Sequence, residues 1–152
     1  MEIGTNDWSN FLINQAKIID IQLDHTQNHL FAIHAMELIK WNHKINITTI
    51  TDPVEVASSH FLDSLVPARF IPSDATMLDI GSGGGFPGRP LKVFLPKLSV
   101  TLIDASRKKT SFLKHVIRSL KLEHIEALHM RAEDLAIQPS FINRFDVVIS
   151  RA

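Results

Sequence analysis

Apolar residues in the first 70 positions recur at intervals of three or four, which is the spacing of amphipathic helices. The pattern predicts three helices. Apolar side chains at this spacing mark the first helix: Phe11, Leu12, Ile18, Ile19 and Leu23. Residues 24–46 carry the second helix, and residues 51–65 begin the third, with Asp52 and Pro53 as its cap and first-turn pair. We therefore expect this part of the chain to be helical.

From residue 76 the pattern changes to short runs rich in β-branched and large apolar residues. Four such runs predict strands: TMLDI (76–80), LSVTLID (98–104), IEALH (125–129) and FDVVIS (145–150). Helical patterns separate them: PLKVFL (90–95), RKKTSFLKHVIRSLKL (107–122) and AEDLA (132–136). Because strands that alternate with helices form parallel sheets with crossover helices, we expect an α/β sheet of four strands preceded by a helical cap.

Composition narrows the class of protein. The length of 152 residues suffices for one domain with a hydrophobic core. Acidic and basic residues balance at 16 each, so net charge indicates no nucleic-acid partner and any basic surface must be local. Cysteine is absent, which excludes disulfides and thiolate metal sites. No apolar run is long enough to cross a bilayer, and the polar N-terminus is unlike a secretory leader. We expect a soluble, cytoplasmic protein that binds no membrane.

The stretch MLDIGSGGGFPGRPL, residues 77–91, contains five glycines in eight residues directly after the first predicted strand. Glycine allows positive φ and lets backbone N–H groups approach a ligand without interference from a Cβ atom. The second predicted strand ends in Asp104, the position from which an acid binds ribose hydroxyls in nucleotide-binding units. The alternative to a ligand site is a tight turn beside a solvated aspartate. The glycine-rich stretch after the first strand and the acid at the end of the second occur together here, which disfavours this alternative.

Three ligand classes compete for this glycine loop. A P-loop needs Lys followed by Ser or Thr after its last glycine, but Arg89 follows Gly88. A nicotinamide dinucleotide is harder to dismiss, because Gly83, Gly85 and Gly88 spell G-x-G-x-x-G. That register places Pro87, which has no N–H group, where the pyrophosphate would bind.

S-adenosylmethionine has no phosphate to hold. It needs glycines for its amino-acid part, an acid near its ammonium and sulfonium groups, and an acid for its ribose. Asp79 and Asp104 supply both acids on adjacent strands. The sequence therefore favours S-adenosylmethionine as the cofactor, with a nicotinamide-dependent oxidoreductase as the alternative.

Five stretches carry a resemblance: KWNHKINITTITDPVEVASSHFLDSL, LDIGSGGGFPGRPL, TLIDASRKKTSFLKHV, MRAEDLA and FDVVISRA. In this order they resemble successive signatures of the glucose-inhibited division protein B family, also called ribosomal small-subunit methyltransferase G. The resemblance runs from about Leu30 to the last residue. It implies a Rossmann-like S-adenosylmethionine-dependent methyltransferase fold, with a mainly parallel sheet in strand order 3-2-1-4. Residues 1–70 would form the helical cap and residues 71–152 an incomplete methyltransferase domain. The implied activity is methylation of guanine N7 in small-subunit (16S) ribosomal RNA.

The resemblance also implies a cofactor site in the glycine loop. Gly81 and Phe86 would contact S-adenosylmethionine, and Gly83 and Gly85 would shape the loop. Asp104 would bind the ribose.

Two further motifs extend this implied site. Ala132 and Glu133 would hold the adenine, although acids in a first helical turn are also common for the helix dipole alone. Arg151, after the fourth strand, would lie at the carboxyl edge of the sheet, where such sheets bind ligands.

Guanine N7 carries an exposed lone pair and no proton, so its methylation needs alignment rather than a strong general base. The sequence lacks two features that other kinds of base methylation require. ISRA follows the fourth strand in place of the Asn-Pro-Pro-Tyr type of loop that binds exocyclic amines, and no cysteine exists for covalent attack on a pyrimidine. The sequence assigns no catalytic residue.

A run of basic residues without an acid follows the second predicted strand. It supplies the candidate RNA-binding residues Arg107, Lys108, Lys109, Lys114 and Arg118. The alternative is an ordinary solvated helix face. The histidines have no spacing typical of a zinc site, so no metal is expected.

Two departures from the family pattern bear on function. Arg89 stands where the family usually has an apolar residue, which places a charge beside the loop or on the outer face of the helix. The chain also stops at Ala152, whereas family members continue, so we expect a fragment of a longer parent. A non-catalytic piece that binds RNA or cofactor is therefore a further alternative. We expect a monomer.

Overall fold

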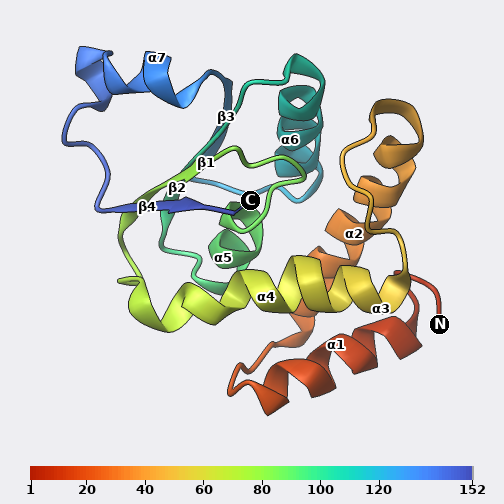
Figure 1. The fold of residues 1–152 in the computed structure, drawn as a ribbon. Coiled ribbons are helices and arrows are strands. Elements are labelled where there is room, and N and C mark those ends of the chain that lie inside the picture. Colours follow the sequence, from red (N-terminus) through yellow and green to blue (C-terminus); the bar gives the residue numbers. More distant parts are fainter. Residues whose placement is uncertain (152) are drawn as a thin grey trace.

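The computed structural model describes residues 1–151 and contains one parallel sheet flanked by helices (Figure 1). The strands are β1 (Thr76–Ile80), β2 (Ser99–Asp104), β3 (Ile125–His129) and β4 (Val147–Ser150). The α-helices are α1 (Asn6–Ile18), α2 (His25–Ile45), α3 (Pro53–Glu55), α4 (Asp63–Leu65), α5 (Gly88–Phe94), α6 (Arg107–Ser119) and α7 (Ala132–Ala136). One π-helix and two 3-10 helices complete the fold: η1 (Val56–Leu62), η2 (Val66–Phe70) and η3 (Pro139–Phe141).

The sheet has the order β3-β2-β1-β4, and each pair of neighbours is parallel. This confirms the predicted α/β class and strand order. At the carboxyl end of β1, Ile80 pairs with Ile103 on one side and Ser150 on the other. Because all four strands run the same way, the loops that follow them meet at one edge of the sheet. The glycine loop, Asp104 and Arg151 are brought together there.

Each face of the sheet packs against its own helices (Figure 1). On one face, Leu102 of β2 shares the main hydrophobic core with Leu91 of α5 and Phe112 of α6. On the other face, Leu78 and Ile103 pack against Leu135 of α7 in a smaller cluster. The alternation of side chains along each strand therefore sends odd and even residues into two separate apolar clusters.

The helix α1 buries a stripe of residues spaced by four: Trp8, Leu12 and Ala16. Ile18, predicted to mark this helix, lies at its last position and is 71% exposed. Ile19 and Leu23, predicted for the same helix, follow its end, so the buried stripe stops at Ala16 and not at Leu23.

The end of α2 shapes a loop that becomes part of the site. Asn46 ends the helix in the left-handed conformation, with φ 48°. The side-chain oxygen of Asn42 accepts hydrogen bonds from the backbone N–H groups of Ile47 and Thr48, at 2.6 and 2.8 Å. These bonds hold the segment 46–50 in one shape.

The third predicted helix forms, but it is not a regular α-helix. Asp52 caps it, as expected, by accepting from the N–H groups of Val54 and Glu55. After α3, however, the backbone widens into the π-helix η1, which tightens again only at α4. Such wide turns often occur at functional sites because they displace side chains from regular helical directions. In this chain the wide turn carries His60.

Of the two places expected for the Arg89 charge, the structure shows the one beside the glycine loop and not the outer face of the helix, since a Cβ atom at Gly85 would lie 2.7 Å from the guanidinium carbon. Its side chain is fully buried, with the guanidinium 5.4 Å from the centre of the Phe112 ring. Within residues 1–151, none of its three side-chain nitrogens has a hydrogen-bond partner. The residues of α5 from Gly88 to Val93 are all buried, so this helix has no outer face at Arg89.

Candidate functional site

The glycine loop leaves β1 at the carboxyl edge and turns into α5. Gly81, Gly83 and Gly85 adopt positive φ, at 67°, 57° and 95°. A Cβ atom added to Gly81 would meet no other atom within 4 Å, and this residue is exposed. At Gly85 a Cβ atom would lie 2.7 Å from the guanidinium carbon of Arg89. Gly81 is therefore open to a ligand, whereas a side chain at Gly85 would be strained at φ 95° and would displace Arg89.

Asp79 supports the loop from below. It is fully buried, and its Oδ2 accepts hydrogen bonds from the Ser82 hydroxyl and the Gly88 N–H, both at 2.9 Å. Burial raises the pKa of Asp79 to about 7, although these two hydrogen bonds oppose the rise. Among the described residues, its Oδ1 has no partner. The Asp79 carboxyl therefore fixes the turn between β1 and α5.

Asp104 ties the glycine loop to the start of α6. Its Oδ2 accepts from the Gly83 N–H at 2.9 Å, and its Oδ1 accepts from the Ser106 N–H at 2.8 Å. Both oxygens retain a further lone pair. The acid predicted for a ribose therefore also orders the loop.

A cavity of about 740 Å³ opens between this loop and the helical part of the chain. Its walls come from four segments: the loop 46–50; Ser59, His60 and Asp63 of η1 and α4; Gly81–Gly84 with Phe86; and Lys109 with Arg151. Of the predicted site residues, Gly81, Gly83, Phe86, Lys109 and Arg151 are thus brought together around one space.

Phe86 lies at the centre of an aromatic stack. His34 stacks on the ring at 4.7 Å between centroids, and His60 stacks on it at 4.4 Å, with interplanar angles of 9° and 6°. The His34 Nε2 also lies 2.8 Å from the Gly84 carbonyl oxygen. Burial, followed by the charge of Arg89, lowers the pKa of His34 well below its usual value. Since both neighbours cover the Phe86 ring, a ligand can reach only its edge.

Ala132 and Glu133 lie at the same edge of the sheet, at the start of α7, but they do not line this cavity. Ala132 packs against the smaller apolar cluster, and Glu133 is exposed. The two predicted adenine residues thus flank the glycine loop beyond Asp104, on the side away from Arg151.

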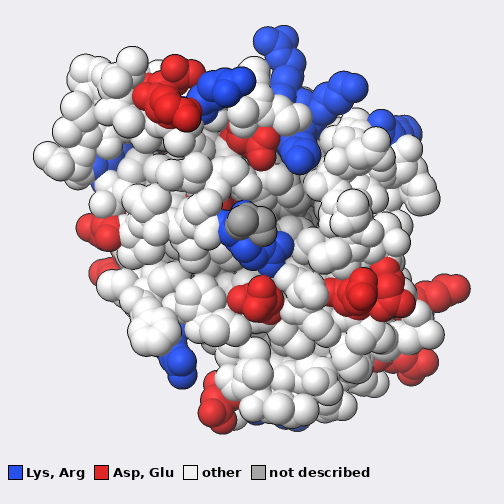
Figure 2. Space-filling model, in the orientation of Figure 1, with Lys and Arg blue, Asp and Glu red and all other residues white. Residues whose placement is uncertain are grey.

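The candidate RNA-binding residues follow one another on α6. Arg107, Lys108, Lys114 and Arg118 are exposed, and only Lys109 reaches the cavity. Figure 2 shows basic side chains gathered over α6 and the neighbouring end of α2, and acidic side chains over α3 and α4. The surface around the cavity is therefore polarised in charge.

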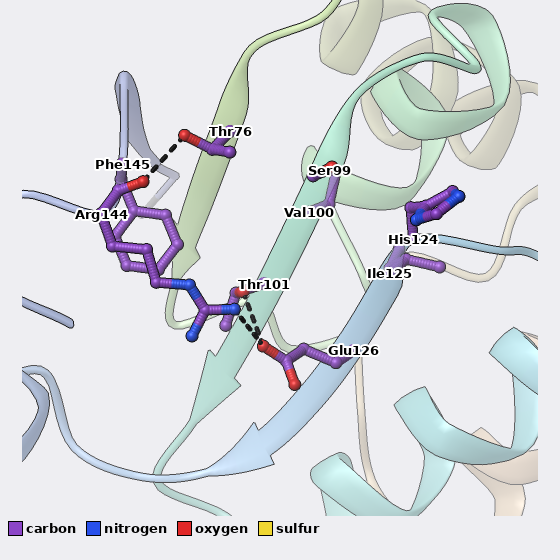
Figure 3. A pocket seen from close by; sticks show the side chains of 9 residues that line it. All are labelled: Thr76, Ser99, Val100, Thr101, His124, Ile125, Glu126, Arg144 and Phe145. Carbon is purple, nitrogen blue, oxygen red and sulfur yellow. Dashed lines mark hydrogen bonds and ion pairs between the residues drawn. The ribbon is translucent and has the colours of Figure 1, made fainter. Parts of the chain in front are cut away.

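A second groove, of about 280 Å³, lies at the opposite end of the strands (Figure 3). Several of its polar groups bond to one another: Glu126 accepts from the Thr101 hydroxyl at 3.0 Å and from Arg144 at 3.2 Å, and the Thr76 hydroxyl donates to the Arg144 carbonyl. These bonds tie Arg144, before β4, to β1 and β3 at this end of the sheet.

Sequence reasoning missed one wall of the cavity. Thr48, His60 and Asp63 lie within a stretch that contributed to the family resemblance, yet only its helical pattern was interpreted. Polar residues cluster on both sides of the start of this helix, in TITD (49–52) and SSH (58–60), and this cluster could have indicated a functional surface.

No group of three or more potential metal-ligating side chains occurs in residues 1–151. Across the same residues, no helix has the length and apolar character that a membrane crossing requires.

Comparison with solved structures identifies the class of fold. The chain superposes on an O-methyltransferase from Bacillus cereus with a TM-score of 0.55 over 96% of this chain and 62% of that one, at 18% sequence identity. The architecture is therefore that of α/β methyltransferases.

Comparison of sequences identifies the family. Residues 27–152 match the family described as rRNA small subunit methyltransferase G, and the chain belongs to this family. It is 43% identical over 134 residues to the ribosomal RNA small subunit methyltransferase G of Desulfitobacterium hafniense, and 43% identical over 149 residues to that of Desulforamulus reducens. The matches cover 88% and 97% of this chain but 56% and 62% of the two relatives.

Proposed function

We propose that this chain binds S-adenosylmethionine at the glycine loop and contributes to methylation of guanine N7 in 16S ribosomal RNA. The observation that carries the proposal is family membership over residues 27–152, joined to a glycine loop that opens onto a cavity. The related fold from Bacillus cereus was solved in complex with S-adenosylhomocysteine, which supports this choice of cofactor.

The residues present fit the cofactor. The open space over Gly81 accommodates its amino-acid part, and the loop conformation at Gly83 and Gly85 keeps that space free of side chains. Asp79 lies beneath the loop, where it accepts from the Ser82 hydroxyl and the Gly88 N–H, so it would serve the cofactor by holding the loop in shape. Phe86 presents its edge to the same space.

The nucleoside end of the cofactor fits the neighbouring loops. Asp104 has lone pairs left for the ribose hydroxyls. Ala132 and Glu133 would hold the adenine beyond it, and Arg151 lies at the other end, beside the cavity.

The start of α5 argues against a dinucleotide. The Gly88 N–H donates to Asp79, and the Arg89 N–H donates to the Gly85 carbonyl. Pro87 and Pro90 have no N–H groups. A pyrophosphate would therefore find a carboxyl group and no free donors at this helix end, which disfavours the oxidoreductase alternative.

The walls of the cavity suit a reaction without proton abstraction. S-adenosylmethionine, when bound, supplies the methyl group. The residues of the chain have to align guanine N7, whose lone pair is already free, and alignment of this kind is worth up to about 7–11 kcal/mol. His60, the imidazole in the described cavity wall, has partners at both nitrogens and is not available as a general base.

The direct test is methyl transfer from radiolabelled S-adenosylmethionine to 16S ribosomal RNA, with digestion to locate the label. The proposal predicts label in 7-methylguanosine. Cofactor binding without any transfer would favour the binding-piece alternative, and label on another base or position would contradict the proposed chemistry.

The exposed basic residues of α6 are proposed to hold RNA phosphates. Changing both Lys108 and Lys114 to Glu should weaken RNA binding and lower the slope of log affinity against log salt by about 1.4–1.8, because each lost phosphate contact removes about 0.7–0.9 from that slope. Fluorescence titrations at several salt concentrations measure both quantities. Lys109 is left unchanged because it lines the cavity.

The matched control changes Lys17 and Lys97 to Glu. Both are exposed, and they lie at the end of α1 and before β2, away from α6, so the net charge changes equally. An unchanged slope is expected for the control. Equal loss of RNA affinity in the two variants would mean that α6 is only a solvated helix face.

A further inference from the structure

His60 lies in the cavity wall on the π-helix, and the assignments above give it no positive role. Its side chain is almost completely buried. The ring stacks on Phe86 at 4.4 Å between centroids, with 6° between the planes. Because the stack fixes the plane of the imidazole, both ring nitrogens point in fixed directions.

The hydrogen-bond partners define which nitrogen carries the proton. Nη2 of Arg151 lies 3.2 Å from Nδ1, and a guanidinium can only donate, so Nδ1 must accept. The proton is therefore on Nε2, which donates to the Thr48 hydroxyl oxygen at 3.0 Å. That oxygen also accepts from the Ile50 N–H at 3.1 Å. One neutral tautomer satisfies every contact.

The surroundings keep the ring neutral at physiological pH. Burial, followed by the charge of Arg151, lowers the pKa of His60 to about 4. Three other titratable groups face this region: His34 on the far side of Phe86, Asp63 at 3.9 Å from Nη1 of Arg151, and Lys109 across the cavity. Only a neutral His60 can accept from Arg151, so the contact persists through the physiological range.

Arg151 is held at two points. Its Nη1 donates to the Ser59 carbonyl oxygen at 2.7 Å, and its Nη2 donates to His60. A guanidinium has five N–H donors, so donors are left over for a ligand in the cavity that Arg151 lines. A long side chain ordered in advance loses less rotamer entropy when a ligand binds.

We propose that His60 is a positioning residue, which holds the guanidinium of Arg151 so that its remaining N–H groups meet acceptor oxygens of the nucleotide to be methylated. This inference rests on the proposed function. Asp104 and Glu133, proposed for the nucleoside end of the cofactor, do not line the cavity, whereas Arg151 does. Arg151 lines the cavity together with Gly81, which is proposed for the amino-acid part of the cofactor beside the sulfonium, and the acceptor nucleotide has to meet the methyl group at that end.

Two amide variants separate the contacts of His60. His60→Asn keeps an oxygen near the place of Nδ1, so it can accept from Arg151. His60→Gln, one methylene longer, keeps an amide nitrogen near the place of Nε2, so it can donate to Thr48. Neither variant has an aromatic ring to stack on Phe86. A difference in activity between the two variants therefore reports the contact with Arg151.

The expected result is a loss of 10–100-fold in kcat/KM for RNA in His60→Gln, because small misplacements in a reacting complex have effects of this size. His60→Asn should retain at least five times the activity of His60→Gln. The affinity of both for S-adenosylhomocysteine should stay within threefold of wild type. In an Arg151→Ala background, His60→Gln should cause no additional loss. Equal activity of the two variants, additive losses, or a loss of cofactor affinity instead would overturn the inference.

A measurement without turnover separates this inference from the proposed function. Nitrogen NMR of wild-type His60 should show the neutral Nε2–H tautomer at pH 7, and Arg151→Ala should disturb that signal. A protonated ring or the Nδ1–H tautomer would refute the positioning role. The expected tautomer in a protein that transfers no methyl group would refute the proposed function, and with it the role in methyl transfer, while leaving the contact geometry intact.

Discussion

Replacing Gly81 with valine is expected to lower the affinity for S-adenosylhomocysteine more than 100-fold, which corresponds to about 2.7 kcal/mol. A side chain at this position would project into space that holds no protein atom within 4 Å, and the proposed cofactor would fill that space. The positive φ of 67° also strains any L side chain, so we expect the free energy of unfolding to fall by about 1–2 kcal/mol. Titration calorimetry and urea denaturation measure the two effects.

Asn143→Val provides the control for backbone strain. Asn143 has a φ of 57°, is exposed, and lies between η3 and β4, at the end of the sheet away from the glycine loop. The control should lose similar stability and bind the cofactor product as wild type does. Unchanged cofactor affinity in Gly81→Val would contradict the assignment of the loop.

Replacing Arg89 with methionine is expected to raise the free energy of unfolding by about 1–4 kcal/mol. The guanidinium is fully buried, and its nitrogens have no hydrogen-bond partner within residues 1–151. Burial lowers the pKa of Arg89 to about 9, so at neutral pH the folded chain holds a charge that the interior disfavours. Methionine fills a similar volume next to Phe112 without a charge. Chemical denaturation measures the gain.

The gain from Arg89→Met should depend on pH through Asp79. With a pKa of about 7, Asp79 is mostly protonated at pH 5.5, so removal of the arginine forfeits no attraction there. At pH 8.5 the carboxylate is ionised and loses a neighbouring positive charge. We therefore expect the larger gain at pH 5.5. The exposed Arg69→Met control should change stability by less than about 0.5 kcal/mol at either pH. A clear loss of stability in Arg89→Met would show that the guanidinium makes favourable contacts.

The sheet was predictable from the sequence because its cause is local. Short apolar runs such as TMLDI carry the strand signal in five residues, and crossover helices between them require parallel pairing. The strand order followed from the family resemblance rather than from the pattern. The π-helix was not predictable, because its width depends on how η1 packs against α1 and Phe86, which are distant in sequence.

Arg89 shows the limit of patterns for charged residues. Its spacing on α5 does not reveal that every side of this helix is covered, since the covering elements α2 and β2 come from other parts of the chain. Asp79 and Asp104, predicted from the sequence as acids that bind the cofactor, lie beside the glycine loop, and their contact with the cofactor stays a prediction. Their hydrogen bonds to Gly88, Gly83 and Ser106 were not foreseen, because the partner groups are backbone N–H groups, which sequence does not distinguish.

The central claim is that the space beside Gly81 accepts a sulfonium nucleoside and not a dinucleotide phosphate. Titration calorimetry of this chain with S-adenosylhomocysteine and, separately, with NADH tests it directly. We expect saturable binding of one S-adenosylhomocysteine per chain and no binding heat with NADH. Tight binding of NADH with no response to S-adenosylhomocysteine would contradict it.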